Sequence, residues 1–547
     1  MTIPNHGPAI LIISALLTIN CLSGAGIPPV APLPAERTVA PGKFEPTWAS
    51  LTENYQCPEW FRDAKLGIWA HWSAQCVPGQ GDWYARSMYV QGHKQYQSHV
   101  EHFGHPSEFG FMEIDNLWKA DKWDPEALMA LYKETGARYF VAMANHEDNF
   151  DAYDSKYHAW NSVNVGPKKD IVGTWARAAR KNGLRFGVSN HSSHAWHWFQ
   201  TAYGYDAEGP KAGVRYDAWR LTKADGKGKW WEGLDPRDLY CKPAIVIPDG
   251  FTSMQAAREW HDANNLPWTE APPPDDPEFA NKWFFRLQNL MDAYKPDFVY
   301  LDNWDLPLGQ VGLDIVAHYY NSSMARDNGR LDVVLTAKGL PAEKRRAAVP
   351  DWERSVSDRI QPEPFETGTC IGQWHYKDDI EYKSVRQVVQ LFVDVVSKNG
   401  TMLLNIPQRG DGSIDEREVA FLKNFAAWTK INGEGIFDSR PWETYGEGPT
   451  RVGRGRARDE AIPYTQDDMR FTAKDGRLYV FVLSPPVRPV TVTSLGLGGE
   501  FARPVGRVEL VGSDEQIKWR QTDEALVIEQ PARLPCEDVI SFRITWK

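Results

Sequence analysis

Polar side chains that can do acid–base chemistry stand directly after short apolar runs of this sequence. Residues 298–301, Phe-Val-Tyr-Leu, are followed at once by Asp302, Asn303, Trp304 and Asp305. Glycoside hydrolysis needs such groups, because one carboxylate attacks the sugar or activates water while a second protonates the leaving oxygen. For a single Asp the alternative is a structural role, as a loop cap or an ion-pair partner. Other runs end in the same way, at His71 and Trp72, at Asn145 to Asp148, and at Asn190 and His191.

The apolar runs are short and unalternating, which is typical of strands buried on both faces of a parallel sheet. Helical patterns separate them; for example, Asp124 and Pro125 indicate a helix start and Gly136 a helix stop. No Gly-rich phosphate loop follows the first strand, and polar residues crowd the strand ends, where barrel active sites assemble. We therefore predict an α/β fold with a (β/α)8-type barrel over residues 57–438.

Three further segments flank or interrupt the predicted barrel. Residues 27–56 form an N-terminal extension, and residues 201–280, rich in Gly, Pro and charge, predict a lid-like insertion at the active-site face. From residue 439 to residue 547 the pattern changes to short alternating strands. This period predicts a separate antiparallel β-sandwich domain.

Composition and the N-terminus indicate an exported protein that does not bind nucleic acid. The formal charge of −11, without a basic cluster, argues against nucleic acid or an anionic membrane as partner, and 24 Trp suit sugar binding. Residues 9–20 have the length of a signal-peptide core and are followed by small residues up to Gly26. We predict a signal peptide over residues 1–26 and a secreted or periplasmic location, with lipid anchoring at Cys21 as the alternative. We expect no membrane span and no zinc pattern among the five other cysteines.

Four ordered blocks carry a family resemblance. Residues 60–89 hold a strand ending in His-Trp, then Val-Pro and an acidic-Trp-Tyr triplet, and residues 145–173 read NHEDNFDAYDSKYHAWNSVNVGPKKDIVG. Residues 393–415 read VDVVSKNGTMLLNIPQRGDGSID, and residues 432–442 read NGEGIFDSRPW. Over about residues 58–442 the chain thus resembles the α-L-fucosidases of glycoside hydrolase family 29.

The resemblance implies an exo-acting, retaining hydrolase without metal or cofactor, which releases α-L-fucose from a fucosylated oligosaccharide or glycoconjugate. It also implies a barrel followed by a β-sandwich. Asp302, at the end of YKPDFVYLD, matches the nucleophile that forms a covalent glycosyl-aspartate. Other residues are expected in the substrate pocket: His71, Trp83 and His146, with Asp82 where the family usually has Glu, and Trp304 as a wall.

The sequence departs from the family pattern at two expected substrate contacts. Glu147 stands in place of the family's second His, and the strand end at His191 replaces a Tyr-rich one. An ionised carboxylate accepts hydrogen bonds but donates none, so the polarity of the pocket differs. Hydrolysis of a related L-configured or 6-deoxy sugar therefore stays open, as does a glycan-binding pseudoenzyme. The oligomeric state is not indicated.

The general acid/base is left between Glu366 and Glu353. Glu366 follows the apolar Phe365, whereas Arg354 beside Glu353 would lower the pKa of Glu353 if the two paired, so Glu366 is preferred. We expect the other Glu to bind a sugar hydroxyl or Arg354. A metal site is the rival reading of two histidine groups, but neither has the carboxylate–His spacing of metallohydrolases, and we predict no metal. The two groups are His191, His194 and His197, and His93, His99, His102 and His105.

Overall fold

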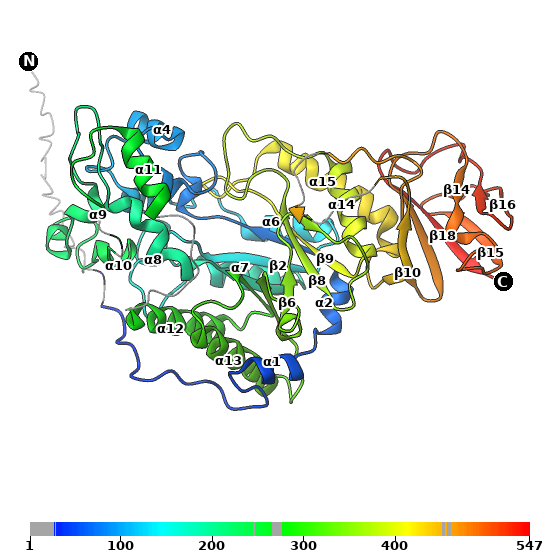
Figure 1. The fold of residues 1–547 in the computed structure, drawn as a ribbon, viewed down its shortest axis with the longest axis horizontal. Helices are drawn as coiled ribbons and strands as arrows, with labels where there is room; N and C mark the ends of the chain where they lie inside the picture. Colours follow the sequence, from blue (N-terminus) through cyan, green and yellow to red (C-terminus); the bar gives the residue numbers. More distant parts are fainter. Residues whose placement is uncertain are drawn as a thin grey trace, which may run out of the picture.

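Eight parallel strands form a closed barrel at the centre of the molecule (Figure 1). The computed structural model describes residues 27, 29–243, 245, 247–264, 276–450, 455–456 and 461–547. The predicted signal peptide and Cys21 lie outside the described residues. The strands are almost wholly buried, as their unalternating sequences require. In chain order they are β1 (Leu66–Ala70), β2 (Tyr139–Asn145), β3 (Arg185–Asn190), β4 (Phe298–Trp304), β5 (Val334–Lys338), β6 (Val349–Asp351), β8 (Phe365–Cys370) and β9 (Gly400–Asn405).

Helices cover the outside of the barrel, and polar caps fix where several of them begin. Asp124 accepts a hydrogen bond from the Ala127 N–H with Pro125 in the first turn, and Asp276 caps its helix in the same way. Residues 339–364, all of them described, connect β5 to β6 and β6 to β8 without an α-helix, so the barrel lacks two helices of the ideal pattern. The main helices are α6 (Pro125–Glu134), α7 (Ile171–Lys181), α12 (Pro277–Tyr294), α13 (Gln310–Arg326), α14 (Val385–Ser397) and α15 (Glu416–Asn432).

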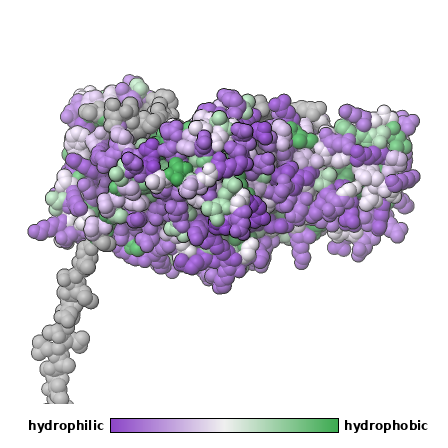
Figure 2. Space-filling model, turned by 90° about the horizontal axis from the view of Figure 1, so that it is seen from below, coloured by the Kyte–Doolittle hydropathy of each residue, from purple (hydrophilic) through white to green (hydrophobic). Residues whose placement is uncertain are grey.

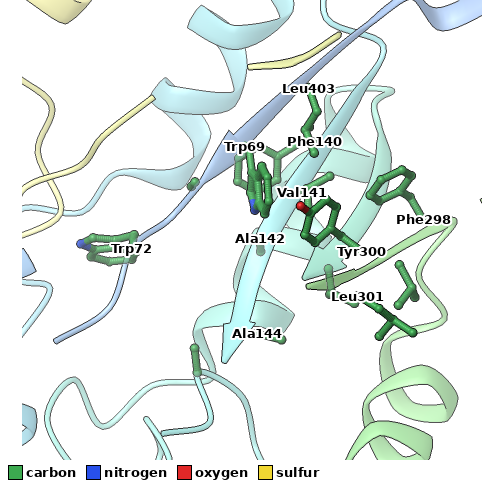
Figure 3. Packing of buried hydrophobic residues seen from close by; sticks show 14 of the residues in the cluster. Trp69, Trp72, Phe140, Val141, Ala142, Ala144, Phe298, Tyr300, Leu301 and Leu403 are labelled. Carbon is green, nitrogen blue, oxygen red and sulfur yellow. The ribbon is translucent and has the colours of Figure 1, made fainter. Parts of the chain in front are cut away.

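Large aromatic side chains fill the barrel interior and form a floor beneath the strand ends. Trp69, Tyr300 and Phe298 lie together in this core (Figure 3). The rings of Trp69 and Tyr300 lie 4.5 Å apart between centroids, and those of Tyr139 and Phe298 lie 5.4 Å apart. The Trp69 indole N–H donates to Ser189 Oγ at 3.2 Å, which satisfies its buried polar atom. The floor is therefore closed, and an active site has room only above it.

The segment between β3 and β4 is built of short helices and is tied to the connection between β1 and β2. Its helices include α8 (Ala195–Trp198), α9 (Asp217–Arg220), α10 (Pro236–Leu239) and α11 (Met254–Asn264). Buried Asp217 accepts hydrogen bonds from the hydroxyls of Tyr89 at 2.8 Å and Tyr240 at 2.5 Å. The bond from Tyr89 holds the insertion to the connection between β1 and β2, the bond from Tyr240 lies within the insertion, and the role of the insertion as a lid stays a prediction.

The C-terminal part folds into two antiparallel sheets around a hydrophobic core of their own, as the alternating sequence predicted. One sheet has the order β10-β12-β13-β18-β15 and the other the order β14-β17-β16. Their bounds are β10 (Arg440–Glu447), β12 (Met469–Lys474), β13 (Arg477–Val482), β14 (Val490–Val492), β15 (Val505–Leu510), β16 (Trp519–Gln521), β17 (Leu526–Ile528) and β18 (Ile540–Trp546).

A buried charge cluster joins this part to the barrel. Asp394 of α14 accepts from Lys398 Nζ at 2.7 Å and from Arg470 Nε of β12 at 2.5 Å. All three side chains are at most 4% exposed, so the three charges depend on one another.

The surface and the cysteines give no sign of a membrane-spanning segment or a disulfide in the described part of the chain. The face seen in Figure 2 is mostly hydrophilic, with small scattered apolar areas. Among the described residues no helix is both long and apolar enough to cross a bilayer. The five cysteines there are free thiols.

Candidate active site

Side chains from all eight barrel strands and the loops after them gather above the aromatic floor. Asp302 lies near the end of β4, and His71, His146 and His191 follow β1, β2 and β3 directly. Lys338 is the last residue of β5. Because parallel strands end at the same rim of a barrel, residues far apart in the chain meet here.

Asp302 is held by two cationic or polar partners. Its Oδ2 lies 3.0 Å from His191 Nδ1, and Lys338 Nζ donates to its Oδ1. Burial by itself would raise the pKa of Asp302, but the positive charge of Lys338 and then His191 hold that pKa well below its usual range. His194 Nε2 contacts the Asp302 backbone oxygen at 2.5 Å and so positions the chain. Asp302 is therefore an ionised, fixed carboxylate.

Lys338 also reaches a second carboxylate. Its Nζ donates to Glu353 Oε2 at 2.7 Å, so one ammonium contacts both Asp302 and Glu353. The Lys338 side chain is 14% exposed and that of Glu353 is 32% exposed, which places Glu353 on the solvent side of the pair. Burial opposes the charge of Lys338, but Asp302 and Glu353 raise its pKa above the ordinary value, so it stays a cation.

Three histidine rings line the pocket beside Asp302. His71 Nδ1 lies 3.1 Å from Asn405 Oδ1, which also accepts from the His71 backbone N–H at 2.9 Å. The rings of His146 and His191 stack with 4.8 Å between centroids. Burial, followed by the neighbouring histidines, lowers the pKa values of His71 and His146 well below the ordinary value. Both rings are therefore neutral, and each can donate a hydrogen bond to a sugar hydroxyl or accept one from it.

Glu147 and Asp82 complete the polar wall of the pocket. Glu147 is 1% exposed and contacts His146 Nδ1. Burial and then the negative charge of Asp302 raise the pKa of Glu147 well above its ordinary value. A Glu147 that keeps its proton donates a hydrogen bond, which an ionised carboxylate does not. Asp82 accepts from His375 Nδ1 at 2.6 Å and lies 4.0 Å from His146 Nε2.

The predicted aromatic and cationic contacts lie around this group. Trp83, with a left-handed backbone at φ 62°, has its ring 6.2 Å from Trp198. Trp304 is 63% exposed at the mouth. The Arg354 guanidinium lies 5.0 Å from the ring centre of Trp374, whose ring is 4.9 Å from His71. Arg354 thus supports the aromatic wall next to His71.

Glu366, which the sequence favoured over Glu353 as general acid/base, does not lie beside Asp302. Glu366 is the second residue of β8 and is fully buried, and its Oε2 accepts from the Tyr139 hydroxyl at 3.1 Å. Tyr139 begins β2 and packs on Phe298 at the start of β4. Asp302 lies four residues further along that strand, ~13 Å at ~3.3 Å per residue. Glu366 therefore belongs to the barrel floor.

Three residues of the site were not among the sequence predictions, and the members of the two histidine groups considered as a rival metal site contact different parts of the molecule. Lys338 was read only as part of a strand, and His375 and Asn405 were not singled out, although each stands at or after a strand end. His194 bonds the backbone of Asp302, while His99 lies between Tyr84 and the Phe109 oxygen. Strand-end position is the signal that would have found Lys338 and Asn405.

Comparison with known proteins agrees with this architecture. The model of the α-L-fucosidase family matches residues 33–434. Tissue α-L-fucosidase of Rattus norvegicus is 26% identical, with 93% of this chain and 94% of the relative covered. The enzyme of Bos taurus is 25% identical, with 92% of each chain covered.

Solved structures share the fold. The crystal structure of Thermotoga maritima α-fucosidase in complex with a mechanism-based inhibitor has a TM-score of 0.67 and 24% identity, covering 92% of this chain and all of that one. The same enzyme in complex with fucose has a TM-score of 0.65 and 24% identity, covering 91% and 99%. Because the family model matches most of the chain and the barrel with its C-terminal sheets recurs, this protein belongs to the α-L-fucosidase family.

Proposed function

We propose that the protein is an exo-acting, retaining α-L-fucosidase, with Asp302 as nucleophile and Glu353 as general acid/base. The observation that carries the proposal is the contact of one ammonium, Lys338 Nζ, with both carboxylates. Two oxygens bound to one nitrogen are at most ~6 Å apart, twice an ordinary hydrogen-bond length. Retaining enzymes hold their carboxyls ~5–5.5 Å apart, whereas inverting enzymes need ~6.5–9.5 Å to admit a water molecule.

The reaction then runs in two balanced steps. Asp302 attacks the anomeric carbon while Glu353 gives a proton to the glycosidic oxygen, so the bond to the leaving group breaks as the ester forms. Water next attacks the same carbon, Glu353 takes a proton from it, and Asp302 leaves as a carboxylate. The lowered pKa of Asp302 suits this role, because only the ionised carboxylate is a nucleophile.

The depth of the pocket supports exo action. His71, His146 and His191 are 2%, 3% and 3% exposed, and the aromatic floor lies below them. A sugar inside a glycan chain needs an opening on both sides, whereas a terminal sugar needs only one. The exposed Trp304 and the partly buried Glu353 then lie on the side from which the rest of a fucosylated oligosaccharide would leave.

The protonated Glu147 supports fucose rather than a related sugar. Like a neutral imidazole, a protonated carboxyl offers one donor and an acceptor. Glu147 can therefore replace the second His of the family without changing the pattern of hydrogen bonds that a sugar meets. Its high pKa comes from burial and from Asp302, so it depends on this pocket.

Export from the cytoplasm is part of the same proposal. It is supported by the apolar block at residues 9–20 and the small residues up to Gly26. Amino-terminal sequencing of the mature protein is expected to start near residue 27, and an intact Met1 would refute export by cleavage.

One assay tests the proposed function. Purified protein should release fucose from an aryl α-L-fucoside and from a fucosylated oligosaccharide, and proton NMR should show α-fucose as the first product. Asp302→Asn should fold normally and release none. Appearance of β-fucose first would refute retention, and turnover by Asp302→Asn would refute the nucleophile.

A further inference from the structure

A ring nitrogen from each of His71, His146 and His191 lies within 4.8 Å of the other two. The three rings follow three neighbouring strands of the barrel, so the fold and not a local sequence motif brings them together. Rings of His71 and His191 lie 5.4 Å apart between centroids, and those of His146 and His191 lie 4.8 Å apart. The three imidazoles are fixed and convergent.

Two of the three rings have an acceptor oxygen behind the Nδ1 atom. His71 Nδ1 faces Asn405 Oδ1 at 3.1 Å, and His191 Nδ1 faces Asp302 Oδ2 at 3.0 Å. At His146 the Gln75 side-chain NH2 donates to Nδ1 at 3.0 Å, and the Glu147 carboxyl also contacts this nitrogen. The oxygen acceptors at Nδ1 of His71 and His191 hold the proton there and leave the Nε2 lone pairs of these two rings for a ligand. His146 supplies the third ring nitrogen of the group.

A hydrogen-bond acceptor at the other ring nitrogen is the arrangement that orients a metal-binding histidine. Within the part of the chain that the structure describes, His191 Nε2 is buried and has no hydrogen-bond partner. Its lone pair is therefore unsatisfied, which a ligand would correct.

We propose that His71, His146 and His191 bind a transition-metal dication of the zinc class. Three imidazoles are a common zinc ligand set with one open position, and imidazole suits Zn²⁺, Co²⁺ and Cu²⁺, whereas Mg²⁺ and Ca²⁺ prefer oxygen ligands. The ionised Asp302, whose Oδ2 lies 3.0 Å from His191 Nδ1, lies close enough to offset the charge. A second group of Asp82, His146 and His375 is less suited, because His375 Nδ1 is already bonded to Asp82 at 2.6 Å.

A metal ion bound to these three histidines inhibits hydrolysis of the fucoside. This inhibition rests on the proposed function. The ion occupies the ring nitrogens that a sugar hydroxyl would use beside Asp302, so metal and fucose exclude each other. Zinc should therefore inhibit hydrolysis competitively, and chelator should restore the full rate.

Cobalt spectroscopy tests the site without turnover. Titration of the chelator-treated protein with Co²⁺ should give a visible absorption band that saturates at one ion per chain. Added Zn²⁺ should remove the band, Mg²⁺ should not, and L-fucose should raise the apparent Co²⁺ dissociation constant. No saturable band, or a band that fucose leaves unchanged, would overturn the proposal.

Two variants identify the ligands. His71→Ala should weaken Co²⁺ binding by more than the ~10–100-fold that loss of an outer partner costs. His375→Ala should keep the band, as should the matched control His102→Ala at the exposed end of α4 (Lys94–His102). Loss of the band in His375→Ala but not in His71→Ala would move the ion to Asp82 and overturn the assignment.

Two controls make the result decisive. If His71→Ala does not fold by circular dichroism, Asn405→Ala, which removes the oxygen behind His71, should weaken binding by ~10–100-fold. Normal cobalt binding there would contradict the proposal. Cobalt binding by a protein that hydrolyses no fucoside would refute the proposed function alone, and hydrolysis without cobalt binding would refute the metal site alone.

Discussion

Replacing Asp351 with Asn should change the stability of the barrel in opposite directions at low and high pH. Asp351 is buried at the end of β6 and accepts from the Tyr300 hydroxyl at 2.8 Å and from the Gly368 N–H at 3.2 Å. Burial raises the pKa of Asp351 from 3.8 to about 7. The positive charge of Lys338 opposes this rise, and the negative charge of Glu353 adds to it. The stabilising contribution of Asp351 is complete below the unfolded pKa, ~3.9, and is lost as pH rises through about 7.

The size of the effect follows from that shift. Roughly 3 pKa units at ~1.4 kcal/mol each give a penalty of ~4 kcal/mol for ionised Asp351 at pH 8. Asn escapes this penalty, but its single oxygen cannot serve both the Tyr300 hydroxyl and the Gly368 N–H, at a cost of ~1–3 kcal/mol. The variant should therefore be ~1–3 kcal/mol more stable than the natural protein at pH 8. At pH 4.5 it should be equal or up to ~2 kcal/mol less stable.

Urea unfolding followed by Trp fluorescence at pH 4.5 and pH 8 measures both differences. Asp249→Asn is the control, because that side chain is 89% exposed and its replacement should have the same small effect at both pH values. An equal stability difference for Asp351→Asn at the two pH values would refute a proton held on Asp351.

Three other changes test the site and the interface. Glu353→Ala should lose ~10²–10⁴-fold in rate on a natural fucoside but far less on a nitrophenyl fucoside, and added azide should restore its rate. Glu366→Gln should stay close to the natural rate. Rescue of the Glu366 variant by azide instead would reverse the assignment. In the pH profile of kcat/KM, Glu147→Gln should abolish the fall at high pH that ionisation of Glu147 causes, and an unchanged profile would contradict this. Asp394→Asn should lower stability by ~3–5 kcal/mol in urea unfolding, because Arg470 and Lys398 lose their buried partner; a loss below ~1 kcal/mol would show that the cluster is unimportant.

The elements were predictable because local chemistry determines them. The apolar runs at residues 298–301 and 401–404 became buried strands, and Asp124 with Pro125 begins a helix as expected. The two connections without helices were not predicted, because the strand at Val349–Asp351 has only three residues and shows no clear period. Closure of the barrel depends on pairing between β1 and β9, which are more than 300 residues apart in the chain.

The site was predictable only where strand-end position marks it. Asp302 and the three histidines follow apolar runs, so their meeting could be expected from the rim of a barrel. The apolar neighbour of Glu366 correctly indicates burial, but a buried residue near the start of a strand lies at the floor of the barrel and not at the rim where the active site forms. Lys338 links Asp302 to Glu353 across the rim, and only the register of β4 and β5 reveals this.

The covalent intermediate tests the account most directly. Protein treated with a 2-deoxy-2-fluoro-α-L-fucosyl donor that carries a good leaving group should gain the mass of one fluorofucosyl group. The fluorine slows both steps, whereas the good leaving group restores the rate of ester formation, so the ester accumulates. Peptide mass spectrometry should place the added mass on Asp302. Label on Glu353 or Glu366, or turnover without any labelled protein, would contradict the assignment of Asp302 as the nucleophile of a retaining enzyme.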